Sequence, residues 1–191
     1  MPAEQIRVAT TGEPMRFGAF TVTLIRSRHF PHGMAMGEIT APLVPPARAT
    51  DYKEGGSYSV LIEHPLGSLL IQGSAGWVDG ALAGRRADVV LLGIGALGMK
   101  DEAYRESYWR EVVEAVNPRC VIPIHYDDFT LPLSERLRPM PNLPDDVDTS
   151  MRFLQQRIGK SVGRGLGLLA EWQAVPLLGA GAAHCGERRA Y

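Results

Sequence analysis

Two apolar strands with a helix between them constrain the fold of this chain more than any other feature. Residues 88–92 and Cys120–Ile124 are nearly continuous apolar runs, the pattern of parallel strands that are covered on both faces. Asp101 can cap a helix over about residues 102–116, and Asn117-Pro118 ends it. A strand, a helix and a strand in this order predict a layered α/β domain.

Turn signals and apolar patterns predict further elements on both sides of this unit. These are strands over residues 20–25, 58–63, 68–72 and near 168–175, and a helix over residues 145–158. The second and third of these strands form a hairpin that turns at Pro65-Leu66-Gly67. We expect one domain over residues 1–178, followed by a flexible tail over residues 179–191.

Composition argues against several classes of partner and location. With 45% hydrophobic and 21% charged residues, the 191-residue chain has the composition of a globular protein. A formal net charge of −1 and the lack of long basic runs predict no nucleic-acid and no anionic-lipid partner. We find no signal-peptide pattern and no apolar run near the roughly 18 residues of a membrane span. Two cysteines, with Cys120 expected as a buried free thiol, predict a reducing cytoplasm.

Two histidines stand in loops directly after predicted strands. His29 follows the first strand in a stretch rich in turn residues, and His125 ends the buried run Cys120–Ile124. Between them, the hairpin leads into Gly73-Ser74-Ala75-Gly76. The order and spacing of these segments resemble the C-terminal part of metallo-β-lactamase-fold hydrolases, over about residues 6–160.

The resemblance implies a fold, a metal and a reaction. The family has an αββα sandwich that binds one or two metal ions at the edge between its sheets. Its ligands come from a His-x-His-x-Asp-His loop, a later histidine, an aspartate after a strand and a final histidine. By this correspondence His29 is the later histidine and His125 the final one. We therefore expect a divalent metal, zinc first, that lowers the pKa of bound water towards about 7. The reaction is hydrolysis of an ester, amide or phosphoester bond in a small-molecule substrate.

Two departures from the family pattern limit what this chain can do alone. No segment matches His-x-His-x-Asp-His, since His29-x-x-His32 has a different spacing, and His32 is expected in a surface loop. The bridging aspartate falls on Ser74, and a neutral hydroxyl is a poor replacement for a carboxylate, so at most one ion is expected. The sandwich is then incomplete, with its N-terminal sheet largely missing. The exposed apolar face predicts a homo-oligomer or a complementing chain. Because two histidines are too few for a zinc site, we expect no catalysis by this polypeptide alone.

Polar neighbours of the two histidines are candidates for lining the site. Asp127 and Asp128 either orient His125, as carboxylates commonly do for metal-bound histidines, or cap the next segment. Tyr126 belongs to the same stretch. Ser74 is expected as a turn residue that lines the site, because no Gly-x-Ser-x-Gly elbow surrounds it. No catalytic residue is assigned.

Two other functions stay open. A non-catalytic remnant or interaction module would retain only the fold. Residues 93–98 fit the Gly-x-Gly-x-x-Gly pattern of a dinucleotide-binding oxidoreductase, after a strand and before a helix. Against this reading, the helix should begin inside the motif, whereas the cap Asp101 follows it and would put a negative charge beside the phosphates. The metal-dependent hydrolase is therefore the leading hypothesis.

Overall fold

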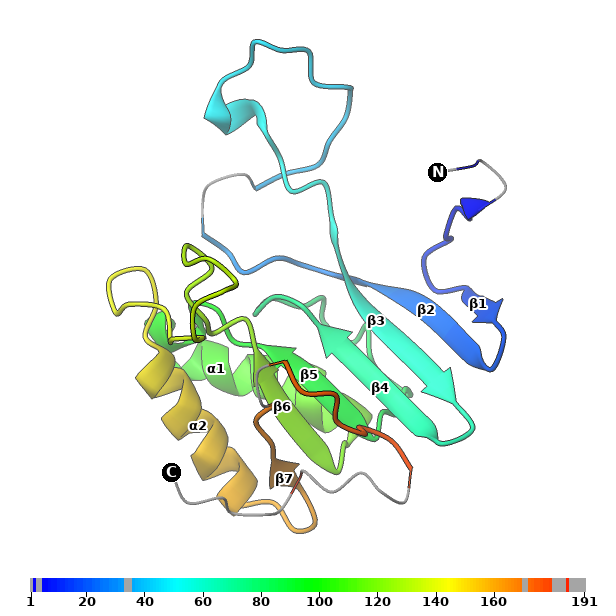
Figure 1. Cartoon of the computed structure of the whole chain (residues 1–191), viewed down its shortest axis with the longest axis vertical. Coiled ribbons are helices and arrows are strands. Elements are labelled where there is room, and N and C mark those ends of the chain that lie inside the picture. Colours follow the sequence, from blue (N-terminus) through cyan, green and yellow to red (C-terminus); the bar gives the residue numbers. More distant parts are fainter. Residues whose placement is uncertain (1, 3–4, 33–35, 170–171, 180–184, 186–191) are drawn as a thin grey trace.

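A single mixed sheet of seven strands organises the chain (Figure 1). The computed structural model describes residues 2, 5–32, 36–169, 172–179 and 185. The strands lie side by side in chain order: β1 Pro14–Phe17, β2 Phe20–Ser27, β3 Ser57–His64, β4 Gly67–Gln72, β5 Val89–Gly93, β6 Cys120–Ile124 and β7 Gly165–Leu166. β1 to β4 pair antiparallel, and β4 to β7 pair parallel. The predicted α/β class is therefore confirmed.

The pairing gives four strands the same direction. β2 and β4 are each antiparallel to β3, so β2 runs the same way as β4 and as its parallel neighbours β5 and β6. The carboxyl ends of these four strands therefore meet at one edge of the sheet, which we call the carboxyl edge. The segments that carry His29, Ser74 and His125 all leave the sheet at this edge.

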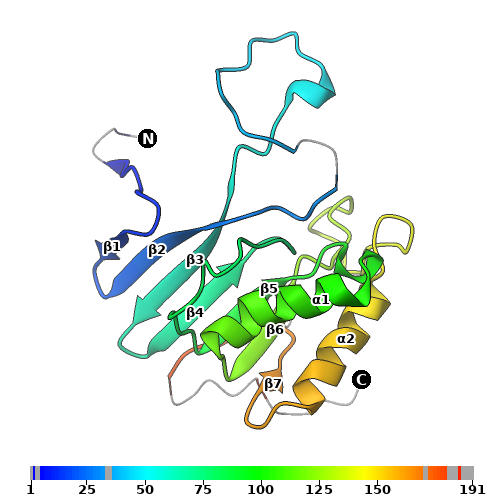
Figure 2. The ribbon, with the colours of Figure 1, turned by 180° about the vertical axis from the view of Figure 1, so that it is seen from behind.

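Helix α1 lies across one face of the sheet, which we call the inner face (Figure 2). It spans Glu102–Tyr108 and continues as a π-helical segment over Trp109–Glu114, which confirms the helix predicted over residues 102–116. The Asp101 side chain caps it by accepting a hydrogen bond from the backbone N–H of Tyr104 at 2.8 Å.

Helix α2 packs beside α1 and completes the core of the inner face. It spans Val147–Gly159, close to the predicted residues 145–158, and the rings of Trp109 and Phe153 meet edge to face at 6.3 Å. The strand residues beneath the two helices are buried and apolar: Ile25, Leu61, Leu70, Val90, Leu92 and Val121.

The opposite, outer face of the sheet is also apolar but is only partly covered. Its side chains form two rows across five strands. One row is Val22, Ile62, Leu69, Val89 and Cys120, and the other is Leu24, Val60, Ile71, Leu91 and Ile122. The C-terminal segment crosses this face in Figure 1 and packs Leu177 and Leu178 against Val89, Cys120 and Ile122. On β2 and β3, the members of both rows keep intermediate exposure.

The state of Cys120 was predicted wrongly. It is not a free thiol, because it forms a disulfide with Cys185, with the two Cα atoms 5.3 Å apart. This bond ties the C-terminal end of the described chain to the outer face of β6. Of the tail predicted over residues 179–191, the structure describes Gly179 and Cys185 alone. The predicted flexibility of this tail therefore lies outside the described residues.

The strand predicted near residues 168–175 is also displaced. The chain pairs with β6 earlier, at Gly165–Leu166, and this ladder ends where the N–H of Gly167 donates to the carbonyl of Val121 at 2.9 Å. The described residues that follow leave the sheet without forming a strand. None of the helices in the described ranges has the length and apolar character that a membrane crossing requires.

Candidate metal centre

The loops after β2 and β4 touch each other at the carboxyl edge. His29 is the second residue after β2, and Ser74 is the second residue after β4. The backbone N–H of Phe30 donates a hydrogen bond to Ser74 Oγ at 2.9 Å. A Cβ at Gly76 would lie 2.5 Å from the carbonyl oxygen of His29, so only glycine permits this approach. Ser74 therefore holds the backbone beside His29.

The Gln72 side chain fixes the backbone of the Ser74 loop. This side chain is buried at the end of β4, where its Nε2 donates to the carbonyl oxygens of Ser74 at 2.8 Å and Gly76 at 2.7 Å. A buried amide with its hydrogens paired favours one loop conformation over alternatives. The position of Ser74 is thus set by the strand that precedes it.

Two tyrosines of α1 hold the same loop from the inner face. The Tyr108 hydroxyl lies within hydrogen-bond distance of the carbonyl oxygens of Ser74 at 3.3 Å and Gly93 at 2.8 Å. The Tyr104 hydroxyl donates to the carbonyl oxygen of Ala75 at 2.7 Å. Burial raises the pKa of Tyr104 to about 12, and burial also raises the pKa of Tyr108 well above its usual value. Both phenols are therefore protonated donors near neutral pH. The sequence predicted this stripe as helix core and gave no sign of these hydroxyl contacts.

His125 lies at the same edge, directly after β6, with an exposed side chain. Its φ of +57° is uncommon for a residue other than glycine and turns the chain away from the strand. A Cβ at Gly95 would lie 3.0 Å from Cδ2 of the imidazole and 3.2 Å from Nε2. The loop after β5 thus approaches the His125 ring closely.

The polar residues after His125 have structural contacts of their own. Asp128 Oδ1 accepts hydrogen bonds from the N–H of Thr130 at 3.1 Å and from its hydroxyl at 2.6 Å, as expected if it caps the next segment. Asp127 forms a β-bridge with Pro139, and Tyr126 packs against the main core. Of the two roles predicted for Asp128, these hydrogen bonds favour capping of the next segment.

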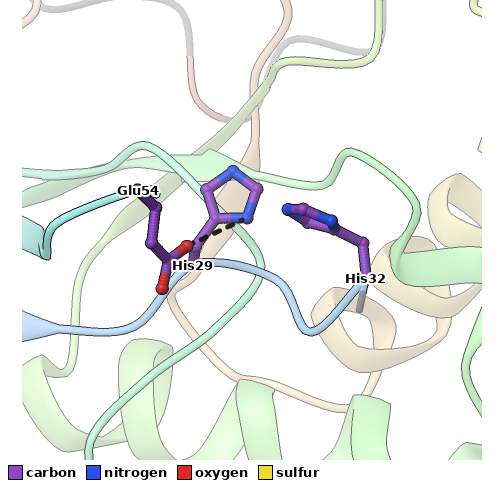
Figure 3. Close-up of side chains that lie close together, drawn as sticks. All are labelled: His29, His32 and Glu54. Atoms are coloured by element: carbon purple, nitrogen blue, oxygen red, sulfur yellow. Dashed lines mark ion pairs between the residues drawn. The ribbon is translucent and has the colours of Figure 1, made fainter. Parts of the chain in front are cut away.

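Three side chains that commonly bind metals gather at the base of the loop between β2 and β3 (Figure 3). They are His29, His32 and Glu54, and one ligand atom from each lies within 4.8 Å of the others. Glu54 Oε2 is 3.8 Å from Nδ1 of His29, and the two imidazole rings meet edge to face at 4.9 Å. Among the described residues this is the one group of at least three such side chains, and His125 is not a member. Glu54 was not predicted as a site residue, because no sequence motif marks it.

The glycines of residues 93–98 are explained by packing within the chain. Besides the contact of Gly95 with His125, Gly98 lies so close to the backbone of Asp146 that no Cβ fits there. Helix α1 begins at Glu102, after the glycines, as its cap predicted. No protein-family model and no curated protein sequence matches the chain. Its function must therefore be argued from the geometry of the carboxyl edge.

Proposed function

We propose that this chain is the metal-binding part of a metal-dependent hydrolase of the metallo-β-lactamase type. The observation that carries the proposal is the carboxyl edge, where strands of one direction end in the loops that carry His29, Ser74 and His125. Helices on the inner face and an apolar outer face support the proposal, because one half of an αββα sandwich would have both. Its outer face is where a second sheet would pack.

The donors proposed at this edge would suit a single ion. His29 and His125 offer imidazole nitrogens, which are good zinc ligands. Ser74 is neutral and already accepts the hydrogen bond of Phe30, so it does not replace a bridging carboxylate. Glu54 places a carboxylate beside His29 instead, and imidazole with carboxylate is a common zinc donor set.

The chain contributes positioning to the proposed chemistry. When bound, a divalent ion polarises a carbonyl or phosphoryl oxygen and lowers the pKa of coordinated water to about 7. Gln72 and the two tyrosine hydroxyls fix the Ser74 loop, and Ser74 fixes the backbone beside His29. The proposed substrates are small molecules with an ester, amide or phosphoester bond.

Metal content tests the proposal directly. Elemental analysis of the purified protein should find about one zinc, iron or manganese ion per chain, lost in His29→Ala and in His125→Ala. The matched control is His64→Ala, at the β3–β4 hairpin, where His64 Nδ1 accepts from the N–H of Leu66. A metal content at background, or one unchanged in His29→Ala, would contradict the proposal. If the protein contains about one ion per chain, the metal-loaded protein is assayed on simple esters and phosphodiesters, with chelated protein as the blank.

A non-catalytic interaction module is the second candidate, and the outer face favours it. Apolar side chains of β2 and β3 stay partly exposed there, including Val22, Leu24, Val60 and Ile62. Contiguous apolar patches of this kind mark interaction surfaces. A compact monomer at all concentrations in analytical ultracentrifugation would count against this candidate.

A further inference from the structure

The side chains of His29, His32 and Glu54 come from the two ends of one loop. His29 and His32 lie where the chain leaves β2, and Glu54 lies shortly before β3 begins (Figure 3). Their ligand atoms lie within 4.8 Å of one another. In a tetrahedral zinc site with Zn–N distances near 2.0 Å, ligand atoms are about 3.3 Å apart. Side-chain shifts of about 1 to 1.5 Å would therefore bring the three ligand atoms around one ion.

One carboxylate oxygen of Glu54 is buried without a hydrogen-bond donor. Its Oε2 is inaccessible to solvent and accepts no hydrogen bond, and only 19% of the side chain is exposed. The distance of 3.8 Å to His29 Nδ1 is too long for a hydrogen bond. A buried oxygen that accepts no hydrogen bond costs about 1 to 3 kcal/mol, and more when it is charged. A cation between Glu54 and the histidines would remove this cost.

The backbone between the two histidines is anchored before any ligand binds. Phe30 donates its N–H to Ser74 Oγ at 2.9 Å. Lys100 Nζ donates to the carbonyl oxygen of Pro31 at 3.2 Å and lies 4.8 Å from the centre of the Phe30 ring. Ligands on a fixed backbone lose less entropy on binding, which favours metal affinity.

We propose that His29, His32 and Glu54 together bind one divalent transition-metal ion, of which zinc is the best match. Two imidazoles and one carboxylate form a three-ligand set that leaves a fourth position for water or substrate. Neither His32 nor Glu54 corresponds to a ligand position of the family that the chain resembles. This proposal rests on the proposed function for the role of His29. In place of the family ligands that the chain lacks, it assigns residues of the β2–β3 loop to the metal.

Cobalt titration of the full chain tests this ligand set. Protein stripped with a chelator is titrated with Co²⁺ and followed by visible absorption, and Zn²⁺ then competes for the same site. We expect one equivalent to bind, with affinity reduced at least about 100-fold in His32→Ala and Glu54→Gln, because even outer-shell partners contribute 10- to 100-fold. The controls are His64→Ala and Glu38→Gln, since Glu38 lies in the same loop but pairs with Arg26 at 2.8 Å. Circular dichroism confirms that each variant is folded.

The outcomes separate this ligand set from the proposed function. Binding that is lost in His29→Ala and His125→Ala but kept in His32→Ala and Glu54→Gln overturns the ligand set and supports the proposed function. Binding that is lost in His29→Ala, His32→Ala and Glu54→Gln but kept in His125→Ala supports the ligand set and overturns the family-type assignment. No cobalt binding by the wild-type chain overturns both.

Discussion

The two faces of the sheet have similar side chains and very different surroundings. On the inner face, Leu61, Leu70 and Val90 are buried beneath the helices. On the outer face, neighbouring residues of the same strands, such as Val60 and Ile71, are only half-buried. A strand that is apolar on both faces is typical of a sheet covered on both sides. Among the described residues, the C-terminal segment covers part of the outer face and leaves the apolar side chains of β2 and β3 partly exposed.

The largest expected effect comes from truncating adjacent residues of β4 that point to opposite faces. Leu70→Ala should lower the free energy of unfolding by about 2 to 5 kcal/mol, because it leaves a cavity in the inner core. Ile71→Ala should lower it by only about 1 kcal/mol, because its side chain is already partly hydrated. Urea unfolding measures both values. Equal losses, or a loss for Ile71→Ala that depends on protein concentration, would mean that the outer face is covered in solution.

A second effect concerns the C-terminal segment that packs on the outer face. Cys185→Ser should lower the free energy of unfolding by about 2 to 4 kcal/mol, because the disulfide to Cys120 closes a long loop in the unfolded chain. Urea unfolding of the wild type with and without a dithiol reductant provides the matched comparison. Two reactive thiols in unfolded, non-reduced protein would show instead that no disulfide holds the C-terminal segment on the outer face.

The smallest effect is a pH dependence that belongs to the inner face. The pKa of Tyr104 is raised by burial to about 12, above its usual value near 10, so its protonated form is favoured in the folded state. The resulting stability is present below pH 10 and is lost as the pH rises towards 12. Tyr104→Phe should flatten part of this alkaline decline, whereas Tyr58→Phe, on the outer face, serves as the control. Identical alkaline melting profiles for the wild type and Tyr104→Phe would contradict the assignment.

Elements with strong local signals were predictable from the sequence. β6 was predicted with its observed bounds, because the run Cys120–Ile124 is apolar throughout and leads directly into a loop. The start of α1 followed from the cap Asp101. The strand expected near residues 168–175 failed because an apolar run shows that a segment is buried but not that it is paired. Here the hydrogen bonds to β6 end at Gly167, before that run.

The candidate site was predictable only in part, for a physical reason. His29 and His125 each follow a strand, so their positions at the carboxyl edge follow from strand direction. Glu54 lies at the far end of an irregular loop, and its approach to His29 depends on a chain path that no local signal records. The disulfide was missed for the same reason, since no local signal records that Cys120 and Cys185, 65 residues apart along the chain, approach each other.

The base and the tip of the loop between β2 and β3 carry different kinds of residue. The candidate ligands occupy the base, whereas residues 36–52 project beyond the sheet and are almost all exposed (Figure 1). Lengthening such a loop costs little, about 0.6 kcal/mol for each doubling of its length. Insertions at the tip would therefore change what approaches the site without changing the ligands themselves. This makes residues 36–52 a suitable position for grafting a recognition peptide or an affinity tag.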